Sequence, residues 1–184
     1  MTDLVDDFIY MQVKLLQCSD FPHEIPVQIK LPIPLFAERG DVLLIVKDKE
    51  ARETLASELG FQQIKDVKTV ADIKKEQSGK GIKTYLAKFD LVLVDTRLSL
   101  SSVAKDMGGA KVFMKKRHPP MLVKLTRESV KSNIQEALDT THMLLSGFRE
   151  FTIRCAKTVS MTRKESVKNI INAAIQACAL IFYS

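Results

Sequence analysis

The middle of the chain, about residues 38–120, has the hydrophobic pattern of an open α/β sheet. Residues 42–46 and 91–94 are unbroken apolar runs, which is the pattern of parallel strands covered on both faces. Helical spacing over 50–59 and 70–88 alternates with these runs. Strands that alternate with helices predict a doubly wound α/β domain for this part of the chain.

The N-terminal part has shorter and more mixed patterns. Apolar residues at helical spacing predict a helix over 4–16, and alternation of apolar and polar residues predicts a half-exposed strand over 27–31.

After the prolines at 119 and 120, a short apolar strand is predicted over 121–125, followed by a helix from Val130 to Leu145 with one buried stripe.

The C-terminal part again combines a strand with a helix. Alternation over 151–155 predicts a half-exposed strand, and apolar residues from Val167 to Cys178 predict a final helix. Thr162 and Glu165 have the spacing of a capping box at the start of that helix.

The similar character of the two ends predicts an inserted-domain architecture. Residues 1–37 and 121–184 are expected to form a discontinuous first domain, and residues 38–120 an inserted second domain. Pro32 and Pro34 on one side, and Pro119 and Pro120 on the other, are the expected hinges.

Composition is that of a globular protein, because 46% of the 184 residues are hydrophobic and 27% are charged. No apolar run approaches the roughly 18 residues that span a membrane, and the N-terminus lacks a signal-peptide pattern, so we expect no membrane partner and an intracellular address. The cysteines at 18, 155 and 178 have no zinc-site spacing and are expected to be buried small hydrophobic residues, with no metal bound.

Positive charge is unevenly distributed along the chain. The net charge is +6, but residues 1–24 contribute −4, so the remainder carries +10. Residues 107–127 contain six Lys or Arg and no acid: Lys111, Lys115, Lys116, Arg117, Lys124 and Arg127. Such a surplus favours a polyanionic partner, although lysine-rich surfaces also serve solubility alone.

No catalytic pattern is present in the sequence. The segment 78–81 has neither the spacing nor the position of a phosphate-binding loop. Asp95 at the end of its strand is therefore expected to cap the next helix, with Thr96 or Ser99 as alternatives. The three histidines share no ligand spacing, and no Gly-x-Ser-x-Gly elbow occurs. We therefore expect no enzymatic activity, no cofactor and no small-molecule substrate.

Five segments in order, 29–35, 41–48, 89–97, 109–120 and 153–171, carry a family resemblance. The sequence resembles the ribosomal protein L1 family, and most closely its eukaryotic nucleolar branch, the ribosomal L1 domain-containing proteins of ribosome biogenesis. The resemblance implies a ribosomal L1-like fold, in which an α+β first domain holds an inserted Rossmann-like, three-layer α/β second domain.

The resemblance also implies RNA binding, mainly by the sheet edge and the strand-to-helix turn of the first domain, with the second domain clamping the RNA or contacting neighbours. The residues that it assigns to RNA are Lys30, Lys157, Thr158, Ser160, Met161, Arg163 and Lys164. A secondary RNA contact, or a nuclear import signal, is expected at Lys111, Lys115, Lys116 and Arg117. The alternative for the first set is a plain capped helix that follows a surface strand.

The expected function is therefore non-catalytic RNA binding in ribosome biogenesis, on precursor or mature ribosomal RNA, with pre-ribosomal proteins as partners in the nucleus and nucleolus. One alternative is a structural component of the large-subunit stalk in the cytoplasmic ribosome, and another is a degenerate module that binds proteins. Family members continue past the last helix into a further strand, whereas this sequence ends at Ser184. A truncation, or a loss that leaves a sheet edge open, is expected there.

Overall fold

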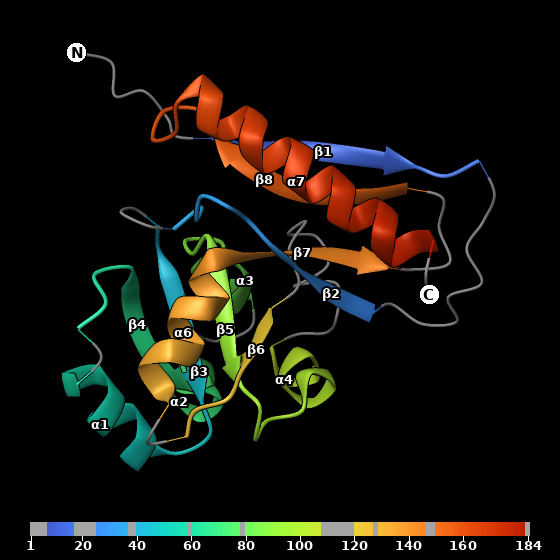
Figure 1. The fold of residues 1–184 in the computed structure, drawn as a ribbon. Helices are drawn as coiled ribbons and strands as arrows, with labels where there is room; N and C mark the ends of the chain where they lie inside the picture. The colour runs from blue at the N-terminus through green and yellow to red at the C-terminus, as the bar shows by residue number, and fades with distance from the viewer. Residues whose placement is uncertain are drawn as a thin grey trace. The chain divides into compact units, whose positions relative to one another are not determined.

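The computed structural model describes residues 7–16, 25–36, 40–58, 60–77, 80–107, 120–126, 129–145 and 150–182. The chain divides into two compact units (Figure 1). Unit 1 combines both ends of the chain, Met1–Ala37 and Leu138–Ser184, and unit 2 is the segment Glu38–Ala137 between them.

Unit 2 is built on a four-stranded parallel sheet with the order β4-β3-β5-β6. The strands are β3 (Val42–Val46), β4 (Ile64–Thr69), β5 (Leu91–Asp95) and β6 (Met121–Val123). Every residue of β3 and β5 is buried, which confirms the expectation from their unbroken apolar runs.

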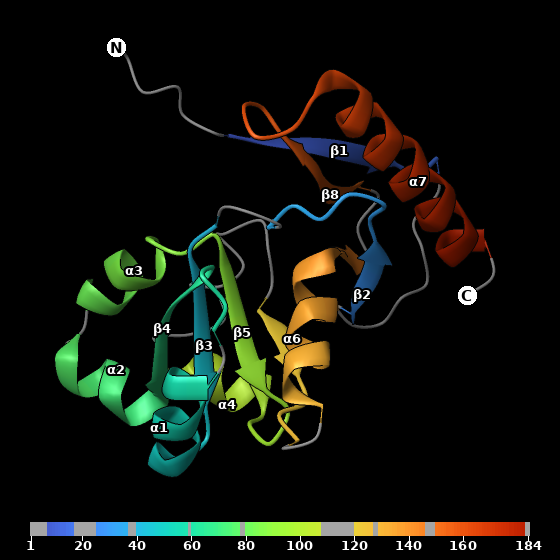
Figure 2. The ribbon, with the colours of Figure 1, turned by 60° about the vertical axis from the view of Figure 1, so that its left-hand side comes forward.

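Helices cover both faces of this sheet (Figures 1 and 2). They are α1 (Lys49–Glu58), α2 (Val70–Glu76), α3 (Lys80–Leu86), α4 (Leu100–Asp106) and α6 (Val130–Asp139). Residues of α2, α3 and α4 pack with Leu43, Ile45, Val92 and Val94 in one core. Along the sheet, the connection β3–α1–β4 runs in the opposite direction to the connection β4–α2–α3–β5. Because such connections are right-handed, α1 lies on the opposite face of the sheet from α2 and α3. The mixed α/β class with a parallel sheet is confirmed.

The second boundary between the units differs from the expected position at 120/121. It lies between Ala137 and Leu138, because β6 pairs in parallel with β5 and completes the sheet of unit 2. The apolar residues Met121 and Val123 are almost fully buried there. Local periodicity identified the strand but did not indicate the sheet to which it belongs.

The described residues of unit 1 form two antiparallel strand pairs and one long helix. β1 (Phe8–Lys14) pairs with β8 (Glu150–Lys157), and β2 (Ile25–Lys30) pairs with β7 (Thr140–Leu145). Helix α7 (Arg163–Phe182) packs against β8 and β2 and buries Ala173 and Ala177.

Two predicted helices were wrong in whole or in part. The described portion of the segment 4–16 is strand β1, and the predicted helix from Val130 to Leu145 ends at Asp139, where β7 begins. In both segments β-forming residues such as Ile9, Val13, Thr140 and Thr141 pair with strands far away in sequence. The helical spacing was therefore overridden by long-range strand pairing.

Amide side chains of α7 fasten the helix to the segment around β2. Asn169 is fully buried; its Nδ2 donates to the carbonyl oxygens of Ile33 (2.8 Å) and Cys155 (3.0 Å), and its Oδ1 accepts from the Ile33 N–H (3.0 Å). Gln176 exchanges two hydrogen bonds with the backbone of Lys30. The backbone of β2 facing α7 is therefore occupied at Lys30 and does not offer an open edge there.

The expectation that all three cysteines are buried was only partly right. Cys155 is buried, and burial raises the pKa of its thiol to about 11, which suits an inert core residue. Cys178 on α7 is exposed, contrary to the expectation, and Cys18 lies outside the described residues.

Candidate nucleic-acid interface

The turn from β8 into α7 is held on both sides by the rest of unit 1. The Thr158 N–H donates to the Asp7 carbonyl (2.9 Å), and the Asp7 N–H donates to Thr158 Oγ1 (2.9 Å), so the pairing of β1 with β8 continues past Lys157. Met161 is buried and anchors the far side of the turn. The turn therefore presents Ser160 and the start of α7 from a fixed position.

The predicted capping box at the start of α7 is confirmed. The Glu165 N–H donates to Thr162 Oγ1 (3.3 Å), while the Thr162 N–H and hydroxyl donate to Glu165 Oε2 (2.8 and 2.7 Å). Hydrogen bonds from the Thr162 backbone and hydroxyl lower the pKa of the Glu165 carboxyl. The only acid of α7 is thus engaged by its own helix terminus.

Positive side chains gather at the exposed start of this helix. Arg163 and Lys164 are the first two residues of α7, and both are exposed together with the neighbouring Ser160. Backbone N–H groups and the positive end of the helix dipole add to their charge at the same end. Of the predicted RNA-binding residues, Thr158, Ser160, Arg163 and Lys164 are therefore brought together.

Lys157 and Met161, which the resemblance assigned to RNA, lie inside unit 1. Lys157 is only 3% exposed, and its Nζ lies 5.1 Å from the ring centroid of Phe8 and 5.4 Å from that of Phe36. Arg154 is also buried, with its Cζ 3.7 Å from the Phe8 centroid. These cation–π contacts keep two positive charges in the interior beside aromatic rings.

Sequence reasoning did not identify Arg154, because its partners come from other segments of the chain. Its positive charge also acts on His142 of β7: burial, and secondarily the charge of Arg154, lowers the pKa of the imidazole to about 4. At neutral pH His142 is therefore uncharged and contributes nothing to an anion-binding surface.

Lys30, another of the predicted contacts, is not part of this group. Lys30 is exposed, but its backbone is bound to Gln176, which is 12 residues beyond Lys164 on α7 and so about 18 Å further along the helix axis. The predicted secondary contact, Lys111, Lys115, Lys116 and Arg117, lies outside the described residues.

Unit 2 has a second cationic feature, an open crevice of about 400 Å³ at the carboxyl ends of β3 and β4. Lys47, Lys49 and Lys74 line it, together with Asp48 and Asp106. Both carboxylates are already paired, Asp48 with Arg97 (3.2 Å) and Asp106 with Lys74 (2.5 Å). The crevice therefore has a surplus of positive charge where doubly wound sheets usually bind ligands.

A buried carboxylate supports the arginine beside this crevice. Asp95 is fully buried at the end of β5 and accepts from the Arg97 guanidinium (2.6 and 2.8 Å) and the Arg97 N–H (3.0 Å). The N-cap position of α4 is Ser99, one of the two alternatives, so the preferred expectation that Asp95 caps this helix was wrong. Asp95 instead holds Arg97 in place, and the bond between them raises the pKa of the guanidinium.

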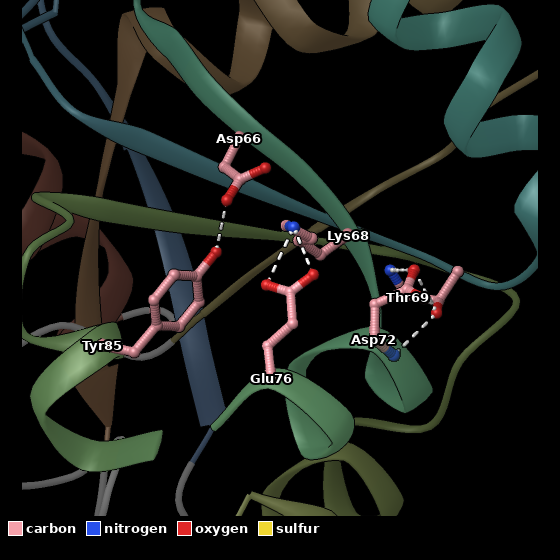
Figure 3. A network of polar contacts seen from close by, with 6 residues as sticks. All are labelled: Asp66, Lys68, Thr69, Asp72, Glu76 and Tyr85. Atoms are coloured by element: carbon pink, nitrogen blue, oxygen red, sulfur yellow. Dashed lines mark hydrogen bonds and ion pairs between the residues drawn. The ribbon is translucent and has the colours of Figure 1, made fainter. Parts of the chain in front are cut away.

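Polar contacts fix α2 and α3 against β4 (Figure 3). The Tyr85 hydroxyl donates to Asp66 (2.6 Å), and burial, then this bond, raises the pKa of the phenol. Lys68 Nζ donates to both carboxylate oxygens of Glu76 (2.7 and 2.9 Å). Thr69 and Asp72 form a second capping box at the start of α2, and Thr69 also lines the crevice. These hydrogen bonds hold α2 and α3 against β4, so their role is structural.

No group of three or more His, Cys, Asp or Glu side chains among the described residues is arranged to hold a metal ion. In the same part of the chain, no helix combines the length and apolar character that crossing a membrane requires.

Comparison with known proteins supplies the family. A search of curated proteins found no match. The family model described as the ribosomal protein L1p/L10e family matches residues 5–179, which is nearly the whole chain and spans both units. The chain therefore belongs to the ribosomal protein L1p/L10e family.

Proposed function

We propose that this protein binds ribosomal RNA or its precursor as a non-catalytic factor in ribosome biogenesis. The observation that carries the proposal is the family match over residues 5–179, since membership indicates RNA binding of the ribosomal type. The net charge of +6 suits a polyanionic partner.

The principal contact in this proposal is the start of α7. Arg163 and Lys164 project from a turn that is fixed by the pairing of Thr158 with Asp7 and by the burial of Met161. A rigid, exposed pair of cations at a helix N-terminus suits phosphate groups of a structured RNA. Lys47 and Lys49 at the crevice of unit 2 are proposed as a secondary contact with the phosphate groups of the RNA.

RNA affinity of charge-reversal variants tests this assignment. Binding of purified ribosomal RNA is measured over a range of salt concentrations for the wild type and for Arg163→Glu/Lys164→Glu. Loss of two phosphate contacts should weaken binding at least about tenfold and reduce the slope of log affinity against log salt by about 2. The matched control, Lys75→Glu/Lys83→Glu, reverses two exposed lysines of unit 2 outside the proposed contacts.

An unchanged affinity and salt slope for the α7 variant would remove the assignment of this helix. The variant Lys115→Glu/Lys116→Glu/Arg117→Glu tests the proposed secondary contact or import signal in the same assay, and its cellular distribution separates the two roles. The role in biogenesis is tested by co-sedimentation. An assembly factor is found with pre-ribosomal particles in the nucleolus, whereas a stalk component is found with translating ribosomes.

A further inference from the structure

Helix α7 carries an apolar ridge on the face turned away from the sheet. Val167, Ile171 and Ile175 follow one another at intervals of four residues, and they are 47%, 56% and 63% exposed. The opposite face of α7 is the buried one, with Asn169, Ala173 and Ala177. Residues four apart form a continuous ridge on a helix surface, which is the shape that fits a groove of another helix.

The two sides of this ridge differ chemically. On one side lies the next row of residues, Ile170, Ala174 and Cys178, of which the latter two are small. The space between this row and the ridge is the kind of groove into which the ridge of another helix packs. On the other side lie Lys164 and Lys168, both exposed. With Glu165 held by Thr162, no acid of α7 balances these two lysines.

We propose that this face of α7 is a docking surface for an amphipathic helix of a protein partner with acidic residues along one flank. Its apolar side chains would fill the groove over Ala174 and Cys178 and cover Ile171 and Ile175. Its acidic flank would lie against Lys164 and Lys168, where both the lysines and the N-terminal end of α7 favour negative charge. The inference goes beyond RNA binding, because the ridge itself is apolar and only Lys164, at its N-terminal end, is shared with the proposed phosphate contacts.

Charge and shape favour this occupant over two others. A second copy of α7 would bring more lysines and no free acid to compensate them, since Glu165 is the only acid of the helix. A membrane surface would match the charge, but α7 contains no tryptophan or tyrosine within Arg163–Phe182 to sit at the headgroups. A ridge with an adjoining groove also fits a helix better than a flat surface.

The test uses two designed peptides of about 20 residues, a length that allows a stable helix. Both have leucines at helical spacing, and they differ only in glutamate or lysine at the flanking positions. Fluorescence anisotropy measures their affinity for the full-length chain, and NMR shifts map the contact. The acidic peptide should bind on α7, and Ile171→Ser/Ile175→Ser should weaken it about tenfold. Lys168→Glu should weaken it as well, whereas Lys75→Glu, an exposed control, should not.

Several results would overturn the proposal. One is that the acidic peptide shows no saturable binding up to about 1 mM. The others are that the acidic and basic peptides bind equally, or that Ile171→Ser/Ile175→Ser binds the acidic peptide as tightly as the wild type does. Self-association that this variant abolishes in sedimentation equilibrium would assign the face to a second copy. Binding to phosphatidylcholine–phosphatidylserine vesicles that the variant abolishes would assign it to a membrane. Ribosomal RNA binding of the same variant should be unchanged, so the two proposals succeed or fail separately.

Discussion

Acidification should destabilise unit 1 through the buried imidazole of His142. Burial and the charge of Arg154 lower the pKa of this group from 6.5 to about 4 in the folded protein. Between these two values the unfolded chain binds a proton that the folded chain does not. The contribution to stability is therefore complete above pH 6.5 and is lost progressively as the pH falls towards 4.

The size of the effect follows from the width of that window. Each pH unit within it corresponds to about 1.4 kcal/mol. At pH 5, about 1.5 units below the ordinary pKa, His142 alone should reduce the free energy of unfolding of unit 1 by about 2 kcal/mol relative to pH 7. His142 is only 9% exposed, so solvent screening reduces this value little.

Urea denaturation at pH 5, 6 and 7 measures this loss, followed by methyl NMR signals of Met143 and Ile153 so that only unit 1 is observed. The control is His142→Gln, which cannot titrate. The difference in the free energy of unfolding between the wild type and this variant should shrink by about 2 kcal/mol between pH 7 and pH 5. A parallel pH dependence of the two proteins, or an imidazole titration midpoint above pH 6 in the folded protein, would refute the reasoning.

Two further predictions concern hydrogen bonds that hold helices to the sheets. Asn169→Leu removes three hydrogen bonds at a fully buried site and should reduce the free energy of unfolding of unit 1 by about 3 kcal/mol in urea denaturation. Gln176→Met, at a more exposed site, should reduce it by about 1 kcal/mol. Equal losses for the two variants would contradict this ranking. Tyr85→Phe removes the bond to Asp66 and should cost unit 2 about 1–2 kcal/mol, and amide exchange in α3 as slow as in the wild type would contradict it.

Features that depend on neighbouring residues were predictable from the sequence. The apolar runs 42–46 and 91–94 indicated buried parallel strands because such strands need apolar residues on both faces. The capping box of Thr162 and Glu165 was predictable because its partners are three residues apart. The exposed cations Arg163 and Lys164 followed from the start of that helix.

Features that depend on distant segments were decided only by the tertiary structure. Residues 8–14 form a strand because they pair with 150–157, and this hydrogen bonding leaves no mark on local spacing. Lys157 is expected from the sequence to be a surface cation, yet the ring of Phe8, brought to it by that pairing, and the ring of Phe36 hold it inside. The sequence by itself determined the family, the capping box of α7 and the buried strands of unit 2. Long-range pairing decided which cations face the solvent, because burial depends on partners that may lie anywhere in the chain.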